Sequence, residues 1–139
     1  MDSLDMAGHL IRRLHQLSTQ VFVQRTQAAG YDLTPIQFAA LDAIHNQPGA
    51  DQATVAEMIA YDRATIGGVI ERLEQKGWVA RVVSERDRRA RELSLTPEGE
   101  RTFQALVPVV RGLQDEILQS LGDADRLRFL KLARQAVGQ

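Results

Sequence analysis

The chain has 139 residues, of which 44% are hydrophobic and 25% are charged, values typical of one ordinary globular domain. This composition excludes a disordered tail, a collagen-like repeat and a disulfide scaffold, and no apolar run approaches the roughly 20 residues of a membrane span. The absence of cysteine excludes thiolate nucleophiles, disulfides and cysteine-based zinc sites. The acidic start, Met1–Asp5, is unlike a secretory signal, so we expect a cytoplasmic protein without a membrane anchor.

The charge is distributed unevenly along the chain. The net charge is −1, yet the segment from Lys76 to Arg91 holds six basic residues against two acidic ones, a local charge of +4 that leaves the rest at −5. A compact basic element on an acidic body is typical of a surface that binds an anion, most often nucleic acid. The alternative is a solvated loop with scattered ion pairs, and charge alone leaves both open.

The first predicted elements are two helices. Residues 4–27 form an apolar stripe at helical spacing, which Gly30 ends. The stripe consists of Leu10, Leu14, Leu17 and Val21, widened by Ile11 and Phe22. Thr34-Pro35-Ile36-Gln37 forms a capping box with proline at the first helical position, which predicts a second helix that ends before Pro48-Gly49.

Two short helices then follow each other closely. Asp51 is the expected cap of a helix that ends at Ile59, and Asp62 is the expected cap of a helix from Arg63 to Lys76. Gly77 is placed where a left-handed C-cap belongs. Such a pair with a three-residue turn predicts a helix-turn-helix.

A hairpin and two more helices complete the expected fold. Residues 79–83 and 92–95 read as strands, with the basic stretch 84–91 as the hairpin tip. Thr96-Pro97 begins a long helix, and Asp123 is the expected cap of a last helix to about Ala136. The fold class is therefore mainly α with a small β-hairpin, a wing that follows a helix-turn-helix.

Three sequence motifs resemble those of the MarR (multiple antibiotic resistance regulator) family. They are Gly77-Trp78-Val79-Ala80-Arg81, then Asp87-Arg88-Arg89-Ala90-Arg91, then Leu93-Ser94-Leu95-Thr96-Pro97-Glu98-Gly99. The resemblance implies one domain over residues 1–139, with dimerisation helices at about 4–27 and 97–137 and a winged helix-turn-helix at about 34–95. It further implies a homodimer that binds a pseudo-palindromic operator in double-stranded DNA and is released by a small molecule.

The second helix of the predicted helix-turn-helix is the candidate for base recognition. If its apolar positions face inward, then the outward-facing residues are Ala64, Gly67, Gly68, Glu71 and Arg72. Two exposed glycines weaken a helix, and close approach of the backbone to the major groove would explain them; tight packing on a neighbouring helix is the alternative. Arg63 and Thr65 at the helix start are placed to reach base edges or phosphates, and Arg72 to reach phosphate.

The hairpin tip supplies the second candidate DNA contact. The resemblance implies that Arg89 enters the minor groove and that Asp87 holds the arginines of the wing in place. Arg86, Arg88 and Arg91 would then neutralise flanking phosphates. An exposed loop with weak ion pairs is the alternative.

A polar cluster on the first helix is the candidate effector site. His9, Arg13 and Gln16 share one flank of the apolar stripe, where they are suited to bind a carboxylate or phenolate, and Phe38 is expected to cover an aromatic ring. Contacts between helices or subunits are the alternative role of these polar residues. The three histidines do not have metal-ligand spacing, and no catalytic triad or phosphate loop can be named. We therefore expect neither an enzyme, nor a metal, nor a cofactor.

The resemblance, together with the basic hairpin, implies a dimeric DNA-binding regulator of transcription, a repressor released by an aromatic acid or phenolic ligand. The apolar ends of the chain, over residues 4–20 and 114–137, are the expected dimer contacts. The competing hypothesis is a winged-helix module that binds proteins and not DNA. The basic wing favours DNA, because a module without DNA contacts would have no use for its charge.

Overall fold

A computed structural model of the chain describes residues 2–87 and 91–139. A 3-10 turn, η1, spans Ser3–Asp5, and the helices and strands follow in chain order. They are α1 (Ala7–Ala28), α2 (Pro35–Asn46), α3 (Gln52–Met58), α4 (Ile66–Gln75), β1 (Val79–Val83), β2 (Arg91–Leu95), α5 (Pro97–Ile117) and α6 (Asp123–Ala136). The predicted class, helices with one small hairpin, is confirmed.

Three helix starts are capped as the sequence predicts. The Thr34 side chain accepts a hydrogen bond from the Gln37 backbone N–H at 3.2 Å, and the Gln37 side chain accepts one from the Thr34 N–H at 3.1 Å. Asp51 accepts from the Thr54 N–H at 2.8 Å, and Thr96 accepts from the Gly99 N–H at 2.9 Å. These local bonds satisfy N–H groups that a helix start leaves unpaired, which is why sequence alone can locate them.

Three other predicted starts are wrong by a few residues. The first helix begins at Ala7, after η1, and not at residue 4. The fourth begins at Ile66 rather than Arg63, because the Asp62 side chain accepts from the Ala64 N–H and closes a turn ahead of the helix. In α6 the N-cap is Gly122, and Asp123 is the first helical residue.

The hydrophobic core lies between α2, α4 and the lower half of α5. The α2 residues Leu41 and Ile44 are fully buried, as are Ile70 and Leu73 on α4. Leu93 of β2 closes this core on the side of the hairpin. The core therefore holds the helix-turn-helix in place. The residues of α4 that are buried in the core determine which of its residues form the outer face.

The hairpin is tied to the helices at its base. Strands β1 and β2 are antiparallel, with Val79 opposite Leu95 and Val83 opposite Arg91. Leu93 exchanges two backbone hydrogen bonds with the connection before α3, donating to the Ala50 carbonyl at 2.9 Å and accepting from the Gly49 N–H at 2.8 Å. The wing thus has a fixed root and a tip that extends beyond the helices.

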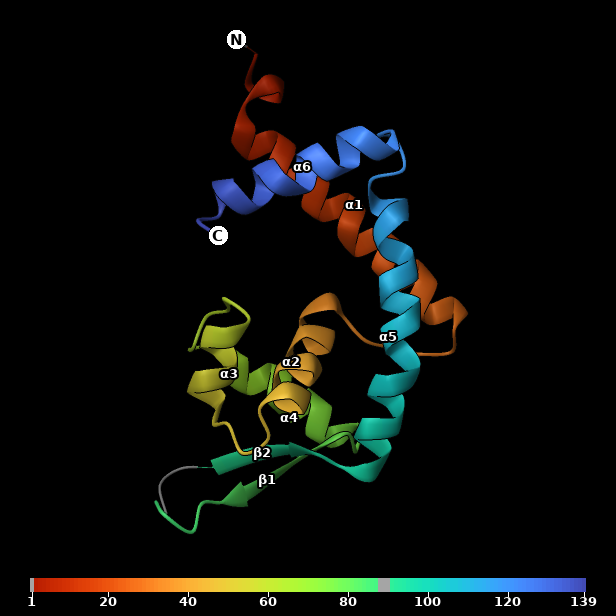
Figure 1. Cartoon of the computed structure of the whole chain (residues 1–139). Helices are drawn as coiled ribbons and strands as arrows, with labels where there is room; N and C mark the ends of the chain where they lie inside the picture. The colour runs from red at the N-terminus through yellow and green to blue at the C-terminus, as the bar shows by residue number, and fades with distance from the viewer. Residues whose placement is uncertain (1, 88–90) are drawn as a thin grey trace.

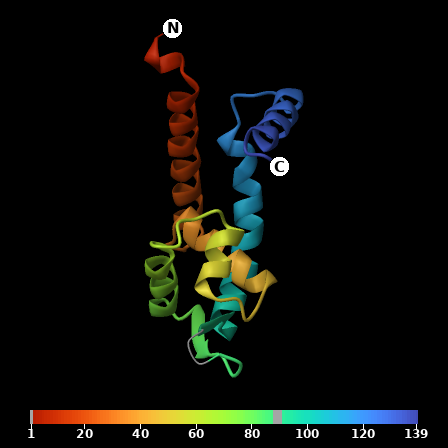
Figure 2. The same cartoon turned by 90° about the vertical axis from the view of Figure 1, so that its left-hand side faces the viewer.

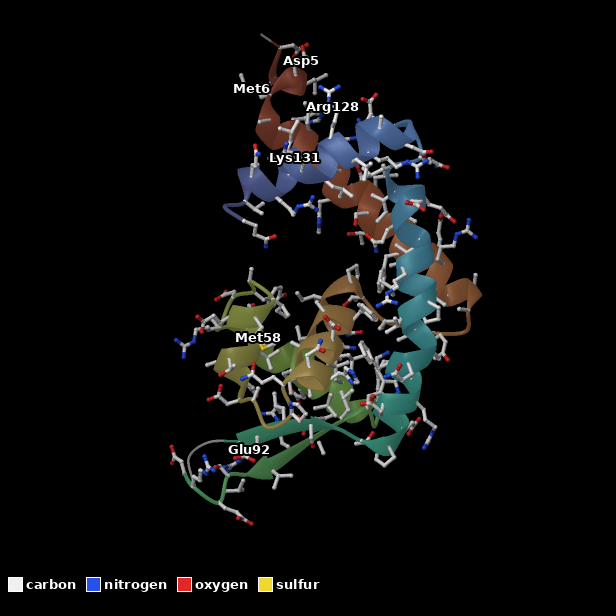
Figure 3. All side chains as sticks on the ribbon, viewed as in Figure 1. Asp5, Met6, Met58, Glu92, Arg128 and Lys131 are labelled. Carbon is white, nitrogen blue, oxygen red and sulfur yellow. The ribbon has the colours of Figure 1, made fainter. Side chains whose placement is uncertain are left out.

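The molecule is elongated, with the wing and α6 at opposite ends (Figures 1 and 2). In Figure 3, Glu92 marks the hairpin and Met58 marks α3, whereas Arg128 and Lys131 mark α6 at the far end. Between these ends, α1 and α5 pack on each other, and Arg25 forms an ion pair with Glu116 at 2.6 Å. None of the helices in residues 2–87 and 91–139 is long and apolar enough to cross a membrane.

Candidate nucleic-acid interface and effector cavities

The exposed face of α4 carries the two adjacent glycines. Gly68 is exposed, and a Cβ added there would meet nothing within 4 Å; at Gly67 it would meet only the Gln52 side chain, at an ordinary 3.5 Å. Packing within the described chain therefore does not require either glycine. The Glu71 and Arg72 side chains are exposed one turn later. At the two glycines, the helix can approach a groove wall more closely than a face with side chains can.

The residues just before α4 do not have the helical placement expected for them. Arg63, Ala64 and Thr65 form an exposed turn, and the Thr65 hydroxyl donates to the Asp62 carbonyl at 3.2 Å. The pKa of Asp51 is lowered mainly by the hydrogen bond from the Thr54 N–H, with a smaller contribution from the charge of Arg63. Arg63 thus lies near the start of α3 rather than on the α4 face.

The wing tip carries several of the predicted phosphate contacts. Arg86 and Asp87 are exposed, and their backbone N–H groups donate to the buried Ser84 hydroxyl at 3.2 and 3.3 Å. Arg91 is exposed at the start of β2. Arg88 and Arg89 lie outside the described residues, so the role expected for Arg89 in the minor groove stays a prediction. The hydroxyl of Ser84 thus orders the backbone of Arg86 and Asp87, at the base of a surface suited to bind an anion.

Two basic residues of the +4 segment have structural partners instead. The Arg81 guanidinium pairs with Glu74 on α4 at 2.7 Å. The Lys76 ammonium donates to the Asp32 carbonyl and lies 5.0 Å from the centre of the Trp78 ring. These contacts fasten the hairpin and the α1–α2 loop to the end of α4.

The structure separates the predicted effector residues into two places. His9, Arg13 and Gln16 line a groove whose described walls come only from η1 and α1. Phe38 lies elsewhere, in a cavity between α2 and α5. Within the described chain, the α1 flank that carries the polar cluster does not border the cavity that contains Phe38, so a single effector site for the four residues stays a prediction.

The cavity between α2 and α5 has a volume of about 360 Å³ and an aromatic wall. The Phe38 and Phe103 rings are stacked with centroids 5.7 Å apart, and the His45 ring lies 4.6 Å from Phe103. Behind His45, Glu100 accepts hydrogen bonds from Gln104 and from His45, and these bonds hold the pKa of its carboxyl below the usual range. Sequence reasoning did not identify the group of His45, Glu100 and Gln104. His45 and Gln104 are 59 positions apart in the chain, and only packing brings them together.

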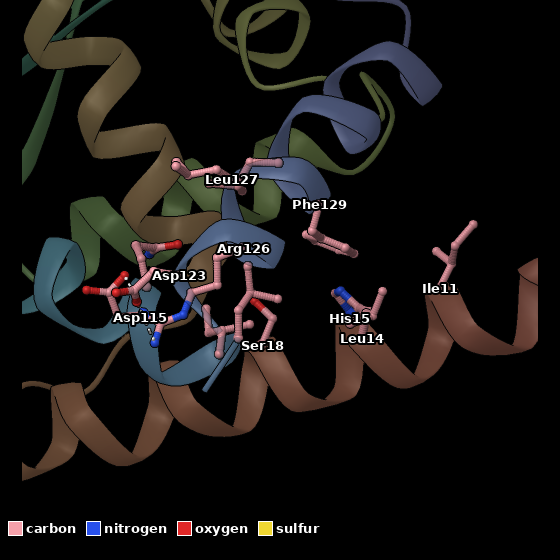
Figure 4. A pocket seen from close by; sticks show the side chains of 13 residues that line it. Ile11, Leu14, His15, Ser18, Asp115, Asp123, Arg126, Leu127 and Phe129 are labelled. Carbon is pink, nitrogen blue, oxygen red and sulfur yellow. Dashed lines mark ion pairs between the residues drawn. The ribbon is translucent and has the colours of Figure 1, made fainter. Parts of the chain in front are cut away.

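A larger cavity of about 660 Å³ lies between α1, the end of α5 and α6. Figure 4 shows Phe129 on α6 facing His15 on α1, and Leu14 and Leu127 also line the cavity. Arg126 pairs with Asp115 at 3.3 Å and with Asp123 at 3.5 Å at one end. Figure 2 shows that α6 stands away from α1, so the described chain does not fill this space.

The sequence and the fold are similar to those of known regulators. The family model described as MarR family matches residues 31–90. The HTH-type transcriptional repressor NicR of Pseudomonas putida is 33% identical over 98% of this chain and 85% of its own length.

Two solved structures share the whole fold. The structure reported for regulation of DNA binding of Bordetella bronchiseptica BpsR by 6-hydroxynicotinic acid has a TM-score of 0.89 and 29% identity, covering 100% of this chain and 98% of that one. The PcaV transcriptional regulator of Streptomyces coelicolor, in complex with its natural ligand, has a TM-score of 0.87 and 31% identity, covering 99% and 95%. The chain, with its winged helix-turn-helix between long terminal helices, belongs to the MarR family of transcriptional regulators.

Proposed function

We propose that this chain is a homodimeric, DNA-binding regulator of transcription that acts in the cytoplasm, not an enzyme, and that a small aromatic acid releases it from its operator. The observation that carries the DNA contact is the combination of two adjacent open glycines on α4 with an arginine-rich wing sequence. The first admits close approach to the major groove, and the second suits the electronegative minor groove and its flanking phosphates. Family membership supports both roles.

The proposed DNA contacts comprise three groups. Gly67, Gly68 and Arg72 on α4 would approach the major groove, and the turn Arg63–Thr65 would contact the adjacent backbone. In the wing, Arg89 would enter the minor groove, and Asp87 would hold the wing arginines in place. The flanking phosphates would be neutralised by Arg86, Arg88 and Arg91.

The state of α6 supports a dimer. None of its side chains is buried in the protomer: Leu127 and Leu132 are 70% and 58% exposed, and Val137 just after the helix is 71% exposed. A helix with so much free apolar surface is not stable in isolation and needs a covering partner. A twofold-related copy is proposed to supply it, with contacts in residues 4–20 and 114–137, and this would place two recognition helices on one operator.

The effector is proposed to bind the cavity between α2 and α5, where Phe38 and Phe103 offer an aromatic surface. The cavity lies between α2 and α5, and α2 packs against α4 in the core. A ligand in the cavity can therefore bias the position of α4. His9, Arg13 and Gln16 remain candidates for the anionic group, on the condition that the dimer brings the α1 of one subunit to the cavity of the other. The name of NicR supports a repressor, and the regulation of BpsR by 6-hydroxynicotinic acid supports a small aromatic effector.

Footprinting of the purified dimer on genomic DNA, followed by anisotropy titrations on the recovered site and on random DNA, tests this proposal. We expect a site with two related half-sites and a preference over random DNA of about 10³-fold or more. Equal, weak binding to both DNAs at low and moderate salt would contradict it and would favour the protein-interaction module.

A further inference from the structure

The buried residues of α4 determine which of its residues face away from the core. The buried residues are Ile66, Ile70 and Leu73. Gly68, Glu71 and Gln75 are exposed and form a row on the opposite side of the helix, at helical spacing. A Cβ on Gly68 would meet nothing within 4 Å, so the start of this row is open. Along the row, Glu71 is therefore the first residue whose side chain extends away from α4.

Glu71 differs from the other carboxylate of α4 in its lack of a partner. Glu74 pairs with the Arg81 guanidinium at 2.7 Å, which fastens the hairpin to α4. Within the described part of the chain, the Glu71 carboxylate accepts no side-chain hydrogen bond and forms no ion pair. Its neighbour Arg72 is also exposed, but adjacent residues of a helix point about 100° apart and do not face each other. Packing and pairing among the described residues thus do not account for a carboxylate at this position.

A free carboxylate on a surface that approaches DNA is unfavourable unless it meets a hydrogen-bond donor, because the phosphates repel it. In the major groove, the donors are the amino groups of cytosine and adenine. Adenine presents its N7 acceptor beside the amino group, and guanine and thymine present acceptors of their own. A carboxylate only accepts, so cytosine, whose N4 amino group has no acceptor beside it, is the base that suits it best.

We infer that Glu71 is a specificity-determining residue of α4: its carboxylate accepts a hydrogen bond from the N4 amino group of one cytosine in each half-site and disfavours the other three bases there. The open backbone at Gly68 lets the helix approach closely enough for the Glu71 side chain to reach the base edge. This inference rests on the proposed function, because it assigns base readout to the helix that is proposed to enter the major groove.

Anisotropy titrations of the intact protein on a set of operator duplexes test the inference. In the site that footprinting recovers, each base pair of a half-site is replaced by the other three, with the same change in the second half-site. We expect one position at which the unmodified protein prefers cytosine over every other base by about tenfold or more, since each duplex changes two contacts.

Two variants identify Glu71 as the origin of this preference. Glu71→Ala removes the acceptor and should reduce the cytosine preference at that position by about threefold or more, with the other positions unchanged. Glu71→Gln places a donor beside the acceptor, the combination that pairs with N6 and N7 of adenine, so it should also raise the affinity for adenine relative to cytosine. Asp42→Asn is the control, because it removes one carboxylate charge at an exposed position of α2 and should leave all base preferences unchanged.

The outcomes distinguish this inference from the proposed function. A cytosine preference that both variants retain, or a changed preference at a position where another base is favoured, would overturn the inference. A folded Glu71→Ala protein that binds no DNA would also overturn it, because phosphate contacts do not depend on a carboxylate that reads a base. Absence of any operator preference in the unmodified protein would overturn the proposed function together with the inference. A normal operator preference that the Glu71 variants do not alter would overturn only the inference.

Discussion

A Cβ atom on Gly99 would lie 1.9 Å from the carbonyl oxygen of Trp78. The close approach arises because the first turn of α5 is fastened to the end of α4 and to β1. The Thr96 hydroxyl donates to the Gly77 carbonyl at 2.6 Å, and the Thr96 N–H donates to the Trp78 carbonyl at 3.0 Å. The Thr-Pro-Glu-Gly sequence thus joins the recognition helix, the wing and the long helix at one point.

Gly99→Ala should therefore lower the free energy of unfolding by about 3 kcal/mol, at the upper end of the range for overpacking, because a backbone and not a flexible side chain must move. Denaturant unfolding measures the change. Gly112→Ala on the same helix is the control, since a Cβ there meets nothing within 4 Å and alanine favours a helix by about 1 kcal/mol. Similar stabilities of the two variants would show that the contact is looser than described.

Gly68→Ala should have opposite effects on the free and the DNA-bound protein. The free protein should gain about 0.5–1 kcal/mol of stability, because the position is helical and open. Operator affinity should fall, because a methyl group separates α4 from the groove wall. Thermal unfolding and anisotropy on the same preparation measure both, and unchanged operator affinity would remove the reason proposed for the glycine pair.

In the wing, two arginine substitutions should have different effects on DNA binding. Arg89→Ala should weaken operator binding by about 1–3 kcal/mol, whereas Arg86→Ala should weaken binding to all DNA and lower the salt slope by about one ion. Titrations at several salt concentrations separate the two effects. Arg101→Ala, an exposed arginine on α5, should change neither, and no effect from either wing variant would contradict a DNA role for the tip.

Leu127→Glu should convert the dimer to monomers. Each buried leucine stabilises an interface by about 1.5–3 kcal/mol, and twofold symmetry places the change at two positions. Sedimentation at micromolar concentration measures the result. Met58→Glu is a matched apolar-to-acidic change on α3 and should leave the dimer intact; a Leu127→Glu variant that remains dimeric would show that α6 is not the contact.

Arg13→Ala tests the α1 cluster. If Arg13 holds the anionic group of the effector, the variant should bind operator normally but fail to be released by the acid, and operator DNA should weaken acid binding in the unmodified protein by the same factor. Arg101→Ala is the control, because Arg101 is exposed on α5 and lines neither cavity. Dissociation of the Arg13→Ala dimer would assign the cluster to subunit contacts instead.

Local signals in the sequence by themselves determined several helix starts and the position of the wing. The bonds of Thr34, Asp51 and Thr96 involve residues three positions away, so the sequence locates those helix starts, and the run of arginines locates the wing. The motif Leu93–Gly99 is also local. Thr96 caps α5 and bonds the Gly77 carbonyl, and Gly99 leaves room for the Trp78 carbonyl.

Only the tertiary structure decided which distant residues meet. Asp62 is a good cap in sequence, but its bond to Ala64 closes a separate turn, and the core position of Ile66 sets where α4 begins. Packing also places His9 and Phe38, expected to contact one ligand, in different cavities of the protomer. The contact of His45 with Glu100 spans 55 positions and follows from the angle between α2 and α5, which side-chain packing across the core determines and no local pattern records.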